Sequence, residues 1–253
     1  MRDISKSNET ASPSSEPSAS RPLSGKVALV TGASRGIGRA IALRLASLGA
    51  ALAICGRDNS ALAASHGELE KASARVYSQT ADVTRSEDIA ELVVKAQSAL
   101  GPISILVNNA GIGLFGPVQQ KTEQDWDRVL NSNLKSVFLV SCAVIPGLIR
   151  QNSGDIINIS SLAGRNAFAG GALYCASKWG LQGLTACMAE DLREFGIRVS
   201  CVLPGSVATD FGQHVKDASK ALSPEDVAHA VAMLLTQSSK SFISEIQLRP
   251  LRK

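Results

Sequence analysis

The stretch Val27-Ala28-Leu29-Val30-Thr31-Gly32-Ala33-Ser34-Arg35-Gly36-Ile37-Gly38 decides the fold of this chain. Its first four residues form a continuous apolar run, which is typical of a strand buried on both faces. Three glycines follow, and then a helical pattern that ends at Gly49. Glycines let a strand-to-helix turn bend sharply and approach a ligand closely, and the helix N-terminus favours an anion. An ordinary glycine-rich turn has the same composition, but the position between strand and helix favours binding of a dinucleotide pyrophosphate.

The same alternation of strand and helix continues to the C-terminus. Strand-like runs lie at residues 51–55, 76–79, 103–107, 155–160, 199–203 and 242–248. Helical patterns lie between them, at residues up to 74, 86–100, 122–150 and 171–195, and after the capping box Ser223-Pro224-Glu225-Asp226. The alternation predicts an α/β fold: one domain with a single doubly wound parallel sheet and helices on both faces. Such a sheet binds ligands beyond the carboxyl ends of its strands.

The turn after the second predicted strand selects the nucleotide. A carboxylate there would bind a ribose 2′-hydroxyl and repel a 2′-phosphate, but the sequence has Gly56 followed by Arg57. Arg35 lies in the glycine turn itself. Two guanidinium groups suit the 2′-phosphate of NADP(H). Asp58 is a rival for the carboxylate, although we expect it to cap the next helix.

Two further turns carry short polar side chains. Asp82-Val83 follow the third predicted strand, and Asn108-Asn109-Ala110-Gly111 follow the fourth. Asp82 could accept a hydrogen bond from an adenine amine. Asp and Asn also form turns for purely structural reasons, so each pair taken alone leaves both readings open.

Tyr174 and Lys178 are four residues apart on a predicted helix, so their Cβ atoms lie on one face, roughly 5–6 Å apart. A phenol with a pKa of about 10 needs its anion favoured by roughly 4 kcal/mol to exchange protons near neutral pH. An ammonium about 4 Å away, at an effective dielectric near 20, supplies roughly that much. The pair can therefore make a general acid/base, although a partly exposed helix face has the same pattern.

Composition limits the classes of function. The chain has 253 residues, 45% of them hydrophobic, and a net charge of +4, which suits one sizeable core and does not mark a nucleic-acid binder. Its five cysteines are odd in number and widely spaced, so we expect reduced thiols and a cytoplasmic location. The three histidines lie in no metal-ligand spacing, and we expect no metal.

Residues 1–24 are rich in Ser and Pro and are predicted to be a disordered tail without the apolar region of a secretory signal. Residues 25–253 form the predicted catalytic domain. The longest apolar stretch, residues 137–149, is too short to span a bilayer, so no membrane contact is expected.

The motifs together resemble those of the short-chain dehydrogenase/reductase family over residues 25 to about 248. The resemblance rests on residues 31–38 and 108–111, Asp82, Asn133, Ser161, Tyr174, Lys178, and Pro204-Gly205-Ser206-Val207-Ala208-Thr209. It implies a Rossmann-type NADP(H)-dependent oxidoreductase that interconverts a ketone or aldehyde and an alcohol. The cofactor-binding residues that it implies are Gly32, Ser34, Arg35, Gly36, Ile37, Gly38, Arg57, Asp82, Val83, Asn109, Ala110, Gly111, Tyr174, Lys178, Pro204, Gly205, Val207 and Thr209.

The resemblance also implies catalytic roles. Tyr174 would exchange the proton of the carbonyl oxygen, and Lys178 would lower the pKa of Tyr174 and bind the nicotinamide ribose. Ser161 would hold the carbonyl oxygen, with Ser160 as its competitor. Asn133 would anchor a water that links Lys178 to solvent; without the resemblance, it would be read as a surface residue of the long helix.

Substrate and partners are less constrained. The nearest general resemblance is to 3-oxoacyl-[acyl-carrier-protein] reductases. Their basic docking pair has no clear counterpart, since Asn152 and Phe195 lie near those places, although Arg150 and Arg193 could substitute. Apolar Ile112, Leu114 and Phe115 suit a hydrophobic ketone, and residues 211–222 are too few for the two-helix lid of many relatives. An alternative of another class is a non-catalytic NADP(H)-sensing protein.

We expect a small-molecule carbonyl or alcohol substrate and a homodimer or homotetramer. The family resemblance implies that the subunit contact uses the helix that follows Tyr174. A stripe of small residues there allows a close helix approach, although a helix buried against its own sheet would have the same pattern: Ala176, Gly180, Gly183 and Cys187.

Overall fold

The computed structural model describes residues 21–72, 74–209, 211 and 218–251. Most of the predicted N-terminal tail lies outside the described residues. Its last four positions belong to the fold, because Leu23 is buried in the core and its N–H donates to the carbonyl of Leu48 at 2.9 Å. The folded domain therefore includes residues 21–24, which the sequence assigned to the tail.

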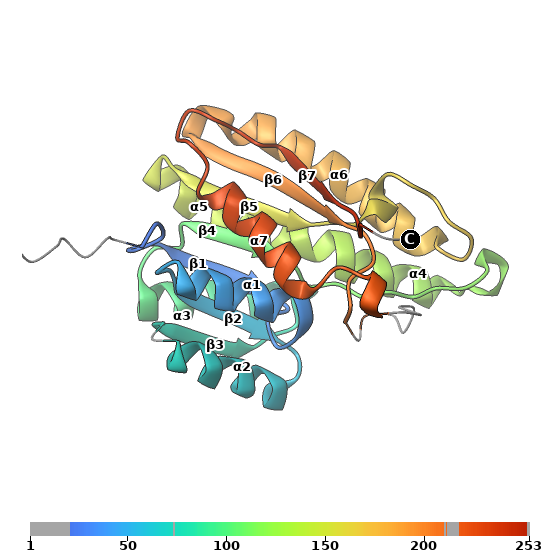
Figure 1. Ribbon diagram of the computed structural model, residues 1–253, viewed down its shortest axis with the longest axis horizontal. Coiled ribbons are helices and arrows are strands. Elements are labelled where there is room, and N and C mark those ends of the chain that lie inside the picture. The colour runs from blue at the N-terminus through green and yellow to red at the C-terminus, as the bar shows by residue number, and fades with distance from the viewer. Residues whose placement is uncertain (1–20, 73, 210, 212–217, 252–253) are drawn as a thin grey trace, which may run out of the picture.

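The sheet has seven strands in the order β3-β2-β1-β4-β5-β6-β7, and every neighbouring pair is parallel (Figure 1). The predicted doubly wound sheet is thus confirmed. The strand order reverses between β1 and β4, which places the expected ligand crevice there. The strands are β1 (Val27–Thr31), β2 (Ala51–Gly56), β3 (Val76–Thr80), β4 (Ile105–Asn108), β5 (Gly154–Ile159), β6 (Ile197–Pro204) and β7 (Glu245–Leu248).

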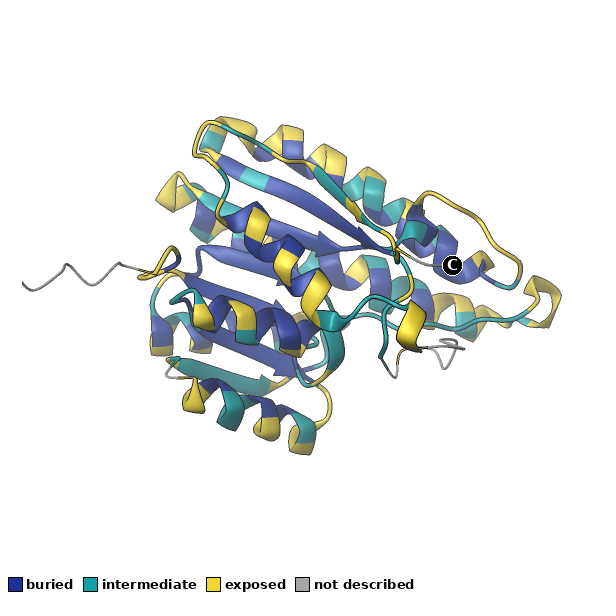
Figure 2. Cartoon of the chain, in the orientation of Figure 1, coloured by how far each residue is buried: buried dark blue, intermediate teal, exposed yellow. Residues whose placement is uncertain are grey.

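Helices cover both faces of the sheet, as Figure 2 shows by the buried strands between helices whose outer sides are exposed. Alternate residues of β1 enter two separate cores: Ala28 and Val30 pack with α1, α2 and α7, whereas Val27 and Leu29 pack with α3, α5 and α6. This alternation explains why the first strand is apolar throughout. The helices are α1 (Gly36–Ser47), α2 (Asn59–Lys71), α3 (Ser86–Leu100), α4 (Glu123–Leu130), α5 (Ser136–Gln151), α6 (Ala172–Leu192) and α7 (Pro224–Leu235).

The predicted long helix is interrupted. Between α4 and α5 lies a π-helical turn, Asn131–Lys135, and Pro146 lies inside α5. Within the described chain, the run Glu123–Gln151 is the one helical segment long and apolar enough to cross a membrane, with a mean hydropathy of 1.6. A helix packed into a protein core needs the same composition, and 44% of this window is buried in the fold. Length and hydropathy alone therefore do not make it a membrane span.

Local signals at the C-terminal end are partly confirmed. The capping box at α7 is present, since Ser223 Oγ accepts from Asp226 N at 3.1 Å and the Asp226 carboxylate accepts from Ser223 N at 2.8 Å. The last strand is shorter than predicted, because β7 begins at Glu245 rather than at residue 242. Between Phe211 and Leu222 the described residues include only a short 3-10 turn, Ala218–Lys220.

Candidate active site

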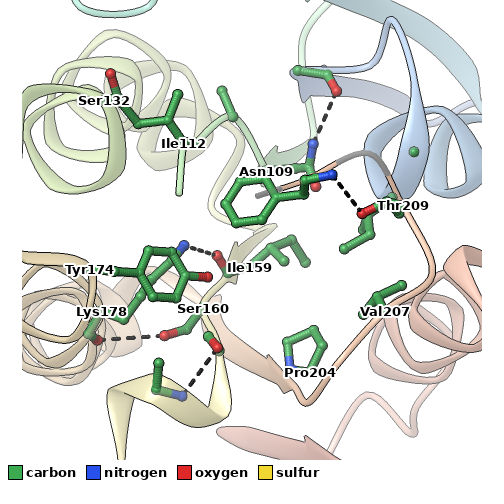
Figure 3. A pocket seen from close by; sticks show the side chains of 18 of the residues that line it. Asn109, Ile112, Ser132, Ile159, Ser160, Tyr174, Lys178, Pro204, Val207 and Thr209 are labelled. Atoms are coloured by element: carbon green, nitrogen blue, oxygen red, sulfur yellow. Dashed lines mark hydrogen bonds between the residues drawn. The ribbon is translucent and has the colours of Figure 1, made fainter. Parts of the chain in front are cut away.

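A cleft of about 1590 Å³ lies at the carboxyl ends of the strands (Figure 3). It is lined by every residue that the sequence proposed for the site except Gly38, Leu114 and Asn133. The fold therefore brings together residues from the turns after β1, β2, β3, β4, β5 and β6, as the switch point of a doubly wound sheet predicts.

The glycine positions of the turn after β1 do not tolerate side chains. A Cβ on Gly38 would lie 2.3 Å from the carbonyl oxygen of Gly32, and Gly32 and Gly36 have φ values of +65° and +55°. No side chain caps the start of α1, whose N-cap residue is Arg35. A bare helix N-terminus reached by a close backbone turn fits the pyrophosphate of a dinucleotide.

A network of hydrogen bonds joins the glycine turn after β1 to the turn after β4. Thr31 Oγ1 accepts hydrogen bonds from the N–H groups of Asn109 and Ala110, at 3.0 and 3.1 Å. The Asn109 amide donates to the carbonyls of Thr31 and Gly32 at 3.0 and 3.1 Å. Asn109 therefore shapes the floor of the cleft with its side chain. The role of Thr31 was missed from sequence, because a threonine at the end of an apolar strand carries no signal of its partners.

The turn after β2 leaves space and positive charge for a nucleotide. A Cβ on Gly56 would lie 2.9 Å from Ser34 Oγ, so a carboxylate at this position would displace Ser34. Arg35 and Arg57 are both exposed and both line the cleft. Asp58 accepts from Ala61 N at 3.0 Å, which confirms that it caps α2.

Asp82 is engaged in its own turn. Its carboxylate accepts from the N–H and the hydroxyl of Thr84, at 2.9 and 2.8 Å. Burial raises the pKa of Asp82, but these hydrogen bonds and the charges of Arg57 and Arg85 outweigh it and hold that pKa below its ordinary value. Asp82 therefore stabilises its own turn, which is one of the two roles that the sequence left open. It also lines the cleft.

At the other end of the cleft, Ser161 and Tyr174 face each other. The Ser161 hydroxyl hydrogen-bonds to the Tyr174 phenol, and Ser161 Oγ also accepts from Ala163 N at 3.1 Å. Ser160 instead turns toward α6: its Oγ lies 3.5 Å from the carbonyl of Lys178 and accepts from the Gln182 amide at 3.3 Å (Figure 3). The choice of Ser161 over Ser160 thus agrees with the geometry.

Burial dominates the electrostatics of Tyr174 and Lys178, which are 8% and 4% exposed. Burial raises the pKa of Tyr174 to about 12, and this effect outweighs the hydrogen bond with Ser161, which lowers that pKa. It lowers the pKa of Lys178 to about 8. The Lys178 amine donates to the Ile159 carbonyl at 2.9 Å and lies 5.8 Å from the centroid of the Tyr174 ring (Figure 3). The expected lowering of the Tyr174 pKa by Lys178 is not found, because burial of the phenol is the largest influence on that pKa and Lys178 is not among its causes. Tyr174 keeps its proton at neutral pH.

Asn133 is buried and is hydrogen-bonded to two other segments of the chain. The interpretation of Asn133 as a surface residue is therefore wrong. Its amide accepts from Ile112 N at 2.7 Å and donates to the Ile112 carbonyl at 3.0 Å. It also donates to Ser177 Oγ at 3.0 Å, and Ser177 donates to the Tyr174 carbonyl at 2.7 Å. The π-helical turn carries Asn133 between the segment after β4 and helix α6, behind the Tyr174 and Lys178 side chains.

Comparisons with known proteins agree with this fold and site. The family described as short chain dehydrogenase matches residues 26–220. The chain is 37% identical over 230 residues to an uncharacterized oxidoreductase of Staphylococcus saprophyticus, covering 90% of this chain and 98% of the relative. It is 36% identical over 233 residues to the sepiapterin reductase of Chlorobaculum tepidum, covering 88% and 96%.

Among solved structures, a metagenomic short-chain oxidoreductase in complex with NADP matches with a TM-score of 0.82 and 45% identity, covering 92% of this chain and 100% of that chain. The chain therefore belongs to the short-chain dehydrogenase family. It is an oxidoreductase of that family with a Rossmann-like fold.

Proposed function

We propose that this protein is an NADP(H)-dependent carbonyl reductase, which converts a ketone or aldehyde to an alcohol. The observation that carries the proposal is a buried phenol, Tyr174, that is hydrogen-bonded to Ser161 and lines the same cleft as the glycine turn. The NADP in the related metagenomic structure supports the choice of cofactor.

Each residue of the proposed catalytic set would have a separate role in the reduction. Bound NADPH would supply the hydride for the carbonyl carbon. Tyr174 would donate its proton to the carbonyl oxygen, and Ser161 would hold that oxygen while its negative charge develops. Lys178 would bind the nicotinamide ribose, as the family resemblance implies. Asn133 would fix the position of α6 and, as the family resemblance implies, anchor a water toward Lys178.

Tyr174→Phe tests the proposed acid. It removes one oxygen, so we expect turnover of a broad panel of ketones with NADPH to disappear while the Kd for NADPH stays within a few-fold. The matched control is Tyr77→Phe, because Tyr77 is bonded to Gln79 on the remote strand β3. Activity retained in Tyr174→Phe would show that another group supplies the proton.

Arg35 and Arg57 are proposed to select NADP(H). We expect wild-type kcat/KM to be higher with NADPH than with NADH, and Arg35→Gln and Arg57→Gln to lower that ratio. Arg44→Gln is the control, since Arg44 lies in the last turn of α1 and does not line the cleft. Equal kcat/KM values with the two cofactors in the wild type would refute this assignment.

Two alternatives remain as separate hypotheses. A 3-oxoacyl-[acyl-carrier-protein] reductase would prefer β-ketoacyl thioesters over simple ketones, so both belong in the panel. A non-catalytic NADP(H)-sensing protein would bind NADPH tightly and turn over nothing. The intact set of Tyr174, Lys178, Ser161 and Asn133 supports the enzyme.

We further propose a homodimer or homotetramer in the cytoplasm. An apolar groove between α4, α5 and α6 is lined by Leu130, Leu134, Phe138 and Leu184, and Trp126 and Trp179 are exposed on the same helices. All five cysteines are free thiols, which suits a reducing compartment. Light scattering of the wild type and of Phe138→Glu tests the assembly; a monomeric wild type would refute it.

A further inference from the structure

A row of aromatic rings runs along the wall of the cleft beside the proposed acid. The ring centroids of Phe168 and Phe115 are 5.9 Å apart, those of Phe115 and Tyr174 are 5.4 Å apart, and those of Tyr174 and Phe211 are 5.9 Å apart. The Phe115–Tyr174 pair meets edge-to-face at 67°, an arrangement that aromatic pairs prefer, and the other two pairs are tilted by 48° and 56°. All four residues line the cleft.

The backbone around this row leaves room for the rings. A Cβ on Gly113 would lie 2.8 Å from Phe115 Cε2 and 3.0 Å from Phe211 Cε1, and one on Gly171 would lie 2.6 Å from Phe168 Cζ. The rings of Phe115, Phe168 and Phe211 therefore rest directly against glycine backbone.

The two loops that carry Phe115 and Phe168 are also tied together. Gly116 N donates to the Gly170 carbonyl at 2.9 Å, and the Lys121 amine donates to the Phe115 carbonyl at 2.6 Å. Phe115 also packs on the small apolar cluster that contains Tyr174 and Ala163. These contacts fix the position of the row relative to the phenol.

Two of the rings remain accessible. Phe168 is 48% exposed and Phe211 is 41% exposed, although both are large apolar side chains in a concave site. Apolar surface of this kind in a cleft is typical of a ligand contact.

The polar groups of this wall are few and are engaged. The cleft-lining residues among 112–117 and 161–170 include no charged side chain, and the Lys121 amine beside them is already bonded to the Phe115 carbonyl. Ser161 is bonded to Tyr174, and the Asn166 amide donates to the Leu162 carbonyl at 3.2 Å. A polyhydroxylated substrate would therefore gain little here.

We infer that the substrate of this site is a ketone that carries an uncharged aromatic ring within one or two bonds of its carbonyl. The inference rests on the proposed reductase function, because it places the carbonyl at Tyr174. A substrate ring beside Phe115 and Phe168 would extend the row of tilted aromatic pairs, and each such pair adds about two- to twelvefold to affinity beyond equal apolar contact.

The test compares phenylacetone with cyclohexylacetone, reduced with NADPH. The two ketones share their carbonyl environment and differ in whether the six-membered ring is flat and aromatic. The expected result is a kcat/KM ratio that favours phenylacetone by about two- to twelvefold for each ring it contacts. A ratio of one or below would overturn the inference, and this comparison needs no variant.

Phe115→Leu and Phe168→Leu then assign the effect to the row. Each variant keeps an apolar side chain and is expected to lower the ratio by about two- to twelvefold. Phe242→Leu is the matched control, because Phe242 packs against the core that contains α3, α5 and α6 and does not line the cleft. An unchanged ratio in both cleft variants would overturn the assignment even if the wild type prefers phenylacetone.

A binding measurement separates this inference from the reductase proposal. Phenylacetamide and cyclohexylacetamide match the two ketones in shape but are not reduced, and their Kd values are measured by calorimetry in the presence of NADP. If no ketone is turned over, the reductase proposal fails, and tighter binding of phenylacetamide that is lost in Phe168→Leu still supports an aromatic site. Equal Kd values for the two amides refute the aromatic site whatever the turnover.

Discussion

Replacing Lys178 by Met is expected to stabilise this protein at neutral pH while removing its activity. Lys178 is 4% exposed, and the dominant cause of its altered pKa is burial of the charge. The fall of that pKa from 10.5 to about 8 corresponds to about 3 kcal/mol that the folded state loses by holding the charged amine.

Met fills a similar volume without charge, but it also removes the hydrogen bond to the Ile159 carbonyl. That loss leaves the buried Ile159 carbonyl without this donor and costs about 2 kcal/mol, so the expected net gain at pH 7 is about 1 kcal/mol in the free energy of unfolding.

The stability gained by Lys178→Met should decrease as the pH rises from 8 to 10. Below about pH 8 the amine is protonated in both the folded and the unfolded chain, so the wild type bears the full cost. Between about 8 and 10.5 the folded chain releases the proton and the unfolded chain keeps it, so wild-type stability rises relative to the variant. At pH 10 we therefore expect the advantage of Lys178→Met to vanish or reverse.

Urea unfolding followed by circular dichroism at pH 7 and pH 10 measures both differences. Lys71→Met is the control, because Lys71 is an exposed residue at the end of α2 and should change stability by well under 1 kcal/mol. A Lys178→Met protein that is less stable than the wild type at pH 7, by the same amount as at pH 10, would refute the reasoning that buried charge dominates at this position.

Three further substitutions test the framework of the site. Gly38→Ala places a Cβ 2.3 Å from the carbonyl oxygen of Gly32, so we expect a lower Tm and weakened NADPH binding by fluorescence titration; an unchanged Kd would contradict the tight-turn reading. Asn158→Ala leaves the buried Thr185 hydroxyl without its donor at 2.9 Å, with an expected loss of about 2 kcal/mol in urea unfolding, and a loss under about 0.5 kcal/mol would show that the buried network contributes little. Ser223→Ala removes the cap of α7, with an expected loss of about 1 kcal/mol; no loss would mean that packing alone holds this helix.

Most of the fold could be predicted from local patterns. The first strand, the glycine turn and the α7 cap are each encoded by a few adjacent residues, because strand burial, positive φ and capping are local requirements. The interruption of the long predicted helix was less predictable. The π-helical turn around Asn133 has no local signature, since it is stabilised by Ile112 and Ser177, which are distant in sequence.

The sequence by itself determined the identity of the chemical groups and their order along the chain: a glycine turn, two arginines and a Tyr-Lys pair at helical spacing. Tertiary structure alone decided what those groups can do. The sequence places Lys178 one helical turn from Tyr174, but only the fold shows that its amine bonds to Ile159. Because burial depends on the packed surroundings rather than on spacing, only the fold raises the pKa of Tyr174 above that of an ordinary tyrosine. The fold also gathers three phenylalanines from separate loops around that phenol.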